Sequence, residues 1–349
     1  MRTVRNVHLR PLRSSGLMAL AALGGAAVLA AAAELALGPS HVPLTDVLAA
    51  LSGRPTDQAL IILDVRLPRM LTAASVGALL GVSGALLQGL LRNPLAEPYL
   101  LGVSSGAALA VAVAIVSGMP AFILGMYAFP PVAFLGAMGA LVGVALLARV
   151  RGRMGTTTLI LAGVVVQAVL SAGVMLIAYA SGSRHFEVVA WLMGHLQPMT
   201  LTQVWWTGVS AVAGTAVALG QSRDLNALSL GEDAAASMGV GVEAAKRRVF
   251  LLASLLTGIA VSASGLIGFV GLIAPHVVRL TTGANNRWLI PGSAFAGAAL
   301  LLLADVVSRT VAAPAELPAG VVTALLGGPF FLVLLVRHAR ASVPGARHP

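Results

Sequence analysis

Long apolar stretches recur along the whole chain. A helix needs about 20 apolar residues to cross the hydrocarbon core of a bilayer. Nine stretches reach or approach that length: residues 16–38, 70–91, 100–118, 122–148, 159–180, 204–220, 249–271, 289–307 and 319–336. A tenth stretch, residues 272–282, is shorter and contains Pro275. The pattern predicts an all-α polytopic membrane protein, with residues 1–349 forming a single transmembrane domain.

The composition excludes a water-soluble globular protein. Hydrophobic residues make up 58% of the chain and charged residues only 10%, whereas soluble domains average roughly 25% charged residues. The absence of cysteine rules out disulfides, thiolate metal sites and a cysteine nucleophile. The net charge of +10 is spread over short loops without interleaved aromatic residues. The positive charge is therefore better explained by cytoplasmic loops that face membrane lipid than by binding to nucleic acid.

The distribution of arginine predicts the topology. Basic residues flank the first and last stretches, which places both termini in the cytoplasm by the positive-inside rule. We therefore expect residues 1–15 and 337–349 to be cytoplasmic tails. Two cytoplasmic ends require an even number of crossings, so residues 272–282 are predicted to cross as a broken tenth helix. Five of the 22 basic residues then lie outside, and the other 17 lie inside; the five are Arg54, Arg66, Arg69, Arg184 and Arg309.

A weak internal repeat suggests two related halves. A shift of 181 residues aligns several pairs, among them Arg66 with Arg247, Gly84 with Gly265, and Pro94 with Pro275. The halves begin at the second and seventh stretches, which are separated by an odd number of spans. They are therefore predicted to form an inverted repeat, the design of many transporters, with the substrate path between them. Chance matches are the alternative in a chain this rich in glycine and alanine.

Proline interrupts the apolar pattern at corresponding places in the two halves. Asn93 and Pro94 follow the second stretch, and Pro275 and His276 follow the seventh. Proline breaks the hydrogen-bond ladder of a helix, and freed backbone groups at membrane depth must face protein or a water-filled path. These four residues are thus candidates for helix breaks that line the path, although ordinary turns explain them equally well. His276 has no further ligands at metal-binding spacing, so no metal site is predicted.

The chain has no ATP-binding motif of its own. Its only lysine, Lys246, follows two alanines, so no phosphate-binding loop exists. Passive conduction, coupling to an ion gradient and a borrowed ATPase all stay open, as does a scaffold that transports nothing. Ion-coupled carriers usually bury carboxylates within their spans, and here Glu34 and Asp305 lie only near span ends. Asp305 precedes Arg309 by four residues, which predicts a local ion pair.

Residues 221–248 form the longest polar interruption, and we predict that they are cytoplasmic. Residues 230–240 are expected to form a short helix, because Glu232 and Asp233 suit its first turn, an alanine run follows, and Gly239 can end it. A short surface helix with a small apolar face suits docking to another protein. A solvated connector is the equally good alternative.

Seven motifs, in the same order, strongly resemble the FecCD-type permeases. These proteins are the membrane subunits of ATP-binding-cassette (ABC) importers for ferric siderophores, haem and vitamin B12. The motifs are RLPR at 66–69, GALLQ at 84–88, NPLAEP at 93–98, LGVSSGA at 101–107, GLIGFVGLIAPH at 265–276, DVVSR at 305–309 and AELPAGVVT at 315–323. The resemblance covers residues 60 to 336.

The resemblance implies a type II ABC importer permease with ten transmembrane helices. It implies a homodimer with the path on its two-fold axis, two cytoplasmic ABC ATPase subunits and one periplasmic or lipid-anchored binding protein. The chain would itself be no enzyme and bind no cofactor, since ATP and Mg would bind to the partner ATPase. The setting would be the cytoplasmic (inner) membrane of a bacterium. An iron chelate, either haem or a ferric siderophore, is the first expectation for the substrate, and a corrinoid is the second.

The resemblance also implies roles for particular residues. Three arginines would grip carboxylates of the binding protein, although anchoring at the lipid headgroups is the alternative: Arg66, Arg69 and Arg309. Residues 230–242 would contact the ATPase, mainly through Leu230, Gly231, Glu232, Ala235, Met238 and Gly239. An inner gate would fall at Thr156, Thr157 and Thr158, a run that also suits an ordinary helix start. The turn at residues 191–195 resembles a family motif, in which the role of His195 is open.

Overall fold

The structure is a computed structural model that describes residues 16–40, 42–118, 129–150, 153–196 and 200–342. Within these described ranges, six helical segments are long and apolar enough to cross a membrane. They are α1 (Gly16–Ala36), the segment Ile61–Leu91, in which the π-helical turn Ile61–Arg66 leads into α3 (Leu67–Leu91), α6 (Phe129–Leu147), α7 (Thr156–Ala180), α12 (Val242–Ser264) and α14 (Asn286–Thr310).

The other elements are shorter or more polar. They are α2 (Leu44–Leu51), η2 (Pro98–Leu101), α4 (Val103–Ser117), the strands β1 (Arg149–Val150) and β2 (Arg153–Met154), η4 (Gly182–Arg184), α8 (His185–Leu192), α9 (Leu201–Gly220), α10 (Ser222–Ser229), α11 (Glu232–Ser237), α13 (Val270–Thr282) and α15 (Ala319–Ser342). The two strands pair as one antiparallel hairpin. The predicted all-α class therefore holds for the described residues, apart from this two-residue hairpin.

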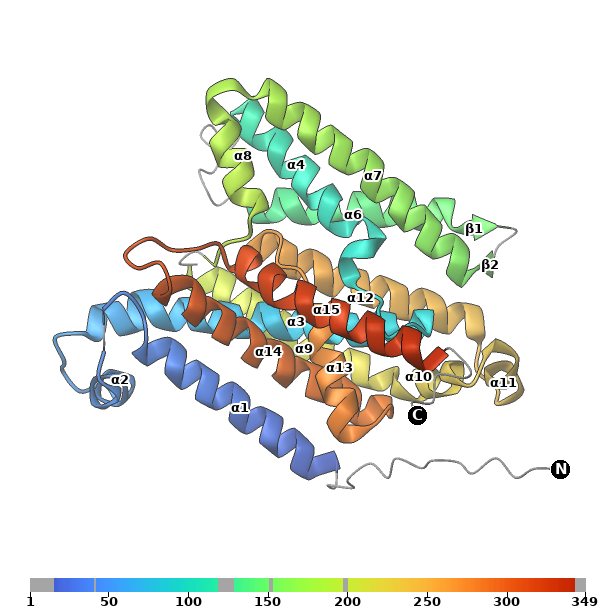
Figure 1. The fold of residues 1–349 in the computed structure, drawn as a ribbon, viewed down its shortest axis with the longest axis horizontal. Helices are drawn as coiled ribbons and strands as arrows, with labels where there is room; N and C mark the ends of the chain where they lie inside the picture. Colours follow the sequence, from blue (N-terminus) through green and yellow to red (C-terminus); the bar gives the residue numbers. More distant parts are fainter. Residues whose placement is uncertain (1–15, 41, 119–128, 151–152, 197–199, 343–349) are drawn as a thin grey trace, which may run out of the picture.

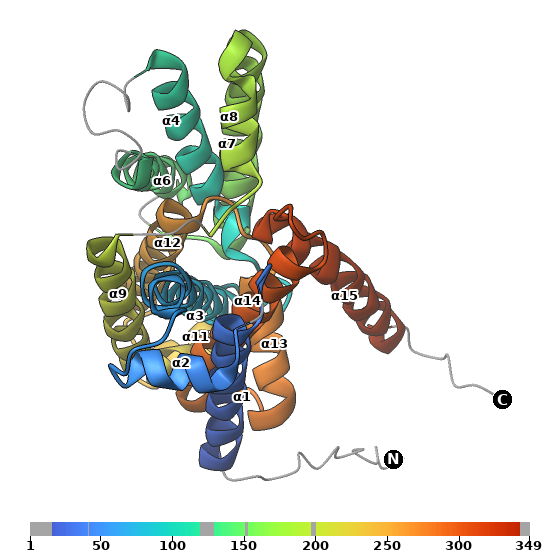
Figure 2. The ribbon, with the colours of Figure 1, turned by 90° about the vertical axis from the view of Figure 1, so that its left-hand side faces the viewer.

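Helix α3 forms the centre of the molecule. It packs against α14, α12, α9 and α13, while α4, α6, α7 and α8 pack among themselves in a second group to one side (Figures 1 and 2). Glycine allows the closest contacts, because a Cβ atom at Gly77 would lie 2.3 Å from the carbonyl oxygen of Gly297 in α14. Such close approach of backbones is typical of helices that pack in lipid.

The first residue of α1 and the last turn of α15 point toward the same end of the bundle. That end also carries α10, α11 and the β-hairpin, and we call it the α11 end (Figure 1). The opposite end carries α2 and the loop between α14 and α15, and we call it the α2 end (Figure 1). The two ends of the helical bundle thus have different structures and different candidate partners.

The expected helix break at Pro275 and His276 is wrong in position. Helix α12 ends at Ser264, the next five residues are not helical, and Pro275 lies inside α13. Gly265 causes the break, because its φ of 67° and ψ of −153° suit only glycine. Pro275 has no N–H to donate to the carbonyl of Gly271, and that oxygen lies against Gly84 of α3, 1.8 Å from where a Cβ would be.

The shift of 181 residues does not align equivalent structure at the glycine and proline pairs. Gly84 lies in the interior of α3, whereas Gly265 ends α12. Pro94 lies in the loop after α3, whereas Pro275 lies within a helix. Matches of small residues arise easily in a chain this rich in them, so these two pairs do not support the repeat.

Candidate functional site

Six charged residues gather at the α2 end, and we call them the arginine cluster. They come from the end of α1, the start of α3, the end of α14 and the loop before α15, which converge at that end (Figure 1). The members are Glu34, Arg66, Arg69, Asp305, Arg309 and Glu316. The cluster contains all three arginines that the sequence assigns to docking.

Arg69 is held by two carboxylates. Its Nε and Nη2 atoms donate to the two carboxylate oxygens of Asp305, at 2.8 and 2.9 Å, and its Nη1 atom lies 2.9 Å from Glu316 Oε2. A guanidinium that forks onto a carboxylate makes one of the strongest charged contacts in proteins. Asp305 is fully buried, whereas the Glu316 side chain is 43% exposed. Glu316 is therefore the carboxylate through which Arg69 meets the surface.

Arg309 bridges two helices. Its Nη2 atom lies 2.5 Å from Glu34 Oε1 in α1, and its Nε atom lies 3.3 Å from Asp305 Oδ2 in its own helix. The ion pair between Asp305 and Arg309 that their spacing predicts is confirmed. The contact with Glu34 joins residues 275 positions apart. The only sequence signal for it was a carboxylate near the end of the first apolar stretch.

Arg66 binds backbone oxygens at the end of α1. Its Nη1 atom donates to the carbonyl of Leu35 at 2.6 Å, and its Nη2 atom donates to the carbonyl and hydroxyl of Ser40. A cation at a helix C-terminus is favourable because the last carbonyls carry partial negative charge. Arg66 thus fixes the end of α1 against the start of α3.

The cluster is buried. Arg66, Arg69 and Arg309 are only 3%, 8% and 3% exposed, because carboxylates and carbonyls of the same chain already neutralise them. They do lie together at one end, as their proposed role requires. However, an outside carboxylate could reach Arg69 only by replacing Glu316, so docking through these arginines stays a prediction.

The opposite end carries the segment assigned to coupling. The predicted short helix is confirmed as α11, with Glu232 and Asp233 in its first turn. Gly231 before it and Gly239 after it have φ angles of 117° and 82°, which favour glycine. At both ends of the helix, the backbone therefore has a conformation that residues other than glycine rarely adopt.

The six predicted coupling residues divide into two groups. Leu230 and Met238 flank α11 and are 70% and 54% exposed, and we call this pair the coupling surface. Ala235 is buried in a cluster with Leu228 and Ala245, and Glu232 lies 2.7 Å from Lys246 in α12. Glu232 and Ala235 therefore hold α11 in place, while Gly231 and Gly239 shape its ends. Only Leu230 and Met238 present large side chains to a partner.

The predicted gate lies at the start of α7, near the β-hairpin. Thr157 is exposed, and Thr158 is partly buried with its side chain close to Gly155. One exposed face runs along α7 at the spacing of three and four residues that marks a single side of a helix. Its members are Thr157, Leu161, Val164, Val165, Ala168, Val169, Ala172, Met175, Leu176 and Tyr179, and we call it the α7 face. Thr156 has its backbone in α7, but its side chain lies outside what the structure describes.

The non-helical residues 265–269 are held by the side chains of Tyr99, in η2, and of Glu97, just before it. The Tyr99 hydroxyl donates to the carbonyl of Ile267 and accepts from its N–H, both at 2.8 Å. The Glu97 carboxylate accepts from the N–H of Phe269. These contacts satisfy backbone groups that helix formation would otherwise pair. Sequence reasoning noted Glu97 in a motif but missed this role for it and for Tyr99.

Two of the four predicted break residues follow α3, and the other two lie within α13. Asn93 accepts from the N–H of Leu95 at 2.9 Å, an ordinary turn contact after α3, and Pro94 is partly exposed beside it. Pro275 is buried within α13, and the His276 ring packs edge-on against Phe330 of α15 at 5.7 Å. Asn93 and Pro94 therefore belong to an ordinary turn, and His276 contacts a neighbouring helix.

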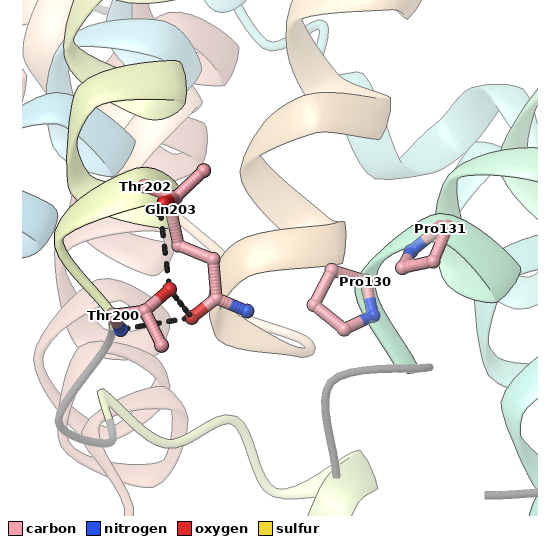
Figure 3. A pocket seen from close by; sticks show the side chains of 5 residues that line it. All are labelled: Pro130, Pro131, Thr200, Thr202 and Gln203. Carbon is pink, nitrogen blue, oxygen red and sulfur yellow. Dashed lines mark hydrogen bonds between the residues drawn. The ribbon is translucent and has the colours of Figure 1, made fainter. Parts of the chain in front are cut away.

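Two further features carry no chemistry of their own. A pocket of about 380 Å³ lies between the starts of α6 and α9, lined by Pro130, Pro131, Thr200, Thr202 and Gln203 (Figure 3). Thr200 and Gln203 already form a capping box there.

The backbone N–H of His195 donates to the carbonyl of Ser264 at the end of α12. In the described part of the chain, no three His, Asp or Glu side chains are grouped as metal ligands would be.

Comparison with known proteins identifies the family. Residues 26–337 match the FecCD transport family. The chain is 44% identical to a hemin transport system permease, HmuU of Yersinia pestis, over 79% of this chain and 83% of that one. It is also 44% identical to a cobalamin import system permease, BtuC of Halobacterium salinarum, over 81% of this chain and 75% of that one.

A solved structure agrees with these sequence relatives. An inward-facing ABC transporter of the metal-chelate type superposes with a TM-score of 0.80 at 33% identity, covering 92% of this chain and 99% of that chain. The family consists of membrane-spanning transport permeases rather than catalytic enzymes. The chain therefore belongs to the FecCD transport family and is a permease of an ABC importer of the metal-chelate type.

Proposed function

We propose that this permease carries an iron chelate, haem or a ferric siderophore, into the cytoplasm, driven by a partner ATPase. This choice of substrate is supported by the 44% identity to a hemin permease, together with the likeness to a metal-chelate transporter. The equal identity to a cobalamin permease makes a corrinoid the second candidate. ATP and Mg would bind to the ATPase, and this chain would bind neither.

The proposed topology has ten crossings with both termini in the cytoplasm. In this proposal the ten crossings would be α1, α3, α4, α6, α7, α9, α12, α13, α14 and α15. Helix α13 has 13 residues and spans only about 20 Å at 1.5 Å per residue. It would cross as the second part of a helix broken at residues 265–269. Two halves beginning at α3 and α12 would then run in opposite directions.

The proposed assembly is a homodimer, and the α7 face supports it. This apolar face is exposed along the whole of α7 in a single chain. A second copy across a shared axis would cover part of it and leave a path between the copies. Thr156, Thr157 and Thr158 would then meet their counterparts at the α11 end and form the inner gate, and Asn93 and Pro94 would lie at the same end.

Two partner sites complete the proposal. At the α11 end, which we assign to the cytoplasm, the ATPase would bind the coupling surface, because exposed Leu and Met side chains outside the spans suit an apolar groove. At the α2 end, a periplasmic or lipid-anchored binding protein would contact the arginine cluster. Its carboxylates would compete with Glu316 for Arg69. Closure of the ATPases on ATP would move α11 and open the gate.

Stimulation of ATP hydrolysis tests the substrate. The permease would be purified with its ATPase and its binding protein, and the binding protein would be loaded in turn with haem, a ferric siderophore or cobalamin. We expect haem or the siderophore to stimulate hydrolysis above the unloaded protein. Stimulation by cobalamin alone would replace the proposal with its alternative. Transport by the permease in vesicles that lack any ATPase would contradict both and favour an ion-coupled carrier.

A further inference from the structure

Lys246 is chemically unusual in this chain. It is the only lysine among 22 basic residues, and it lies in the second turn of α12 with an exposed fraction of 5%. Its neighbours Arg247 and Arg248 are both exposed. A buried ammonium is costly unless carboxylates neutralise it, so its contacts define its role.

Two carboxylates from different parts of the segment meet at Lys246. Its Nζ atom lies 2.7 Å from Glu232 Oε2 and 3.4 Å from Glu243 Oε1. Glu232 is the first residue of α11, and its other oxygen lies 4.0 Å from Nη2 of Arg92, the C-cap residue of α3. One carboxylate thus links α11 to α12 and approaches α3.

The other attachments of α11 are small. Ala235 is its only buried residue, and the apolar cluster around it contains just Leu228 and Ala245 as further buried members. A six-residue helix has little stability by itself, and Gly231 and Gly239 leave the backbone on both sides free of side-chain restraint. The ion pair between Glu232 and Lys246 is therefore the strongest directional contact that α11 makes.

We propose that Lys246 is a positioning residue for energy coupling. On this view, its ion pair with Glu232 transfers a displacement of α11 to α12, which continues as one helix to the break at Gly265. The compact ammonium of lysine has three donors, enough for both carboxylates, and it is smaller than the planar guanidinium of arginine. This inference rests on the proposed function, in which the ATPase binds beside α11.

The test uses the complete importer, with ATPase and binding protein, in proteoliposomes. Uptake per ATP hydrolysed and co-purification of the ATPase are measured for Lys246→Met, for Glu232→Gln, and for the double variant that carries both changes. Arg247→Met is the matched control, because it removes an exposed positive charge one residue away. Glu232→Gln serves as a milder variant, since Glu232 is partly exposed and the glutamine amide oxygen can still accept a hydrogen bond from Lys246.

The expected pattern separates coupling from assembly. Lys246→Met and Glu232→Gln bind the ATPase, since the coupling surface is unchanged, but lose about fivefold or more in uptake per ATP, within the range seen when coupling contacts are removed. The double variant loses no more than Lys246→Met alone, because both changes remove the same ion pair, and Arg247→Met matches the wild type. Wild-type uptake per ATP in Glu232→Gln, or additive losses in the double variant, would overturn the inference. A wild-type importer without ATP-driven uptake would instead contradict the proposed function.

Discussion

Replacing Asp305 by asparagine tests whether the arginine cluster holds the α2 end together. Asp305 is fully buried, binds Arg69 through both oxygens and lies 3.3 Å from Arg309. Asparagine keeps the shape but removes the charge that two buried guanidinium groups share. Breaking a buried ion pair by removing one partner costs about 3–5 kcal/mol. Because asparagine still accepts one hydrogen bond, we expect the lower figure, about 3 kcal/mol.

Thermal unfolding in detergent gives the assay. An unfolding entropy of about 2.1 cal/mol/K per residue over 349 residues gives about 0.7 kcal/mol/K for the chain. A loss of about 3 kcal/mol therefore lowers the Tm by about 4 °C. Asp57→Asn is the control, because Asp57 is exposed in a loop at the same end and its substitution should leave the Tm unchanged. If Asp305→Asn and Asp57→Asn unfold at the same Tm, the cluster does not stabilise this end.

Three further predictions concern packing, partner binding and topology. Gly84→Ala should lower the Tm and the yield of folded protein sharply, because its Cβ would overlap the carbonyl oxygen of Gly271 at 1.8 Å. Leu230→Ser combined with Met238→Ser should abolish co-purification of the ATPase while the Tm of the permease stays unchanged, since both side chains are exposed. In this cysteine-free chain, a single cysteine at Ser229 should react with an impermeant reagent only from the cytoplasmic side.

Each of these predictions has a matched control. Gly139→Ala places the same methyl group in open space within α6 and should leave the Tm unchanged or raise it slightly. Leu60→Ser removes an equally exposed leucine from the α2 end and should leave ATPase binding intact. A cysteine at Ser52, beside α2, should react only from the outside. Labelling of both cysteines from the same side would refute the topology.

Local patterns in the sequence predicted local structure well. The turn chemistry around Glu232 and Gly239 specified α11, and the four-residue spacing of Asp305 and Arg309 specified their ion pair. Both depend on residues within one helical segment, where periodicity alone fixes which side chains meet. The resemblance of ordered motifs then supplied the family, which the comparisons confirm.

Contacts between distant segments were not predictable in this way. No spacing rule joins Glu34 to Arg309 or Arg69 to Glu316, and these contacts bury arginines that sequence reasoning expected to face a partner. The position of the helix break was also missed. The prediction placed the break at Pro275, but α13 continues through this proline, and the backbone conformation of Gly265 ends the preceding helix.

ATP-dependent uptake in proteoliposomes is the decisive experiment on whether this permease imports a chelate with the help of an ATPase. Vesicles would contain the permease with its ATPase, ATP would be supplied on the ATPase side, and a binding protein loaded with iron-labelled haem or siderophore would be added on the other side. We expect accumulation of label that stops when ATP is replaced by a non-hydrolysable analogue or when the ATPase subunit is omitted. Accumulation that continues without the ATPase would contradict this expectation.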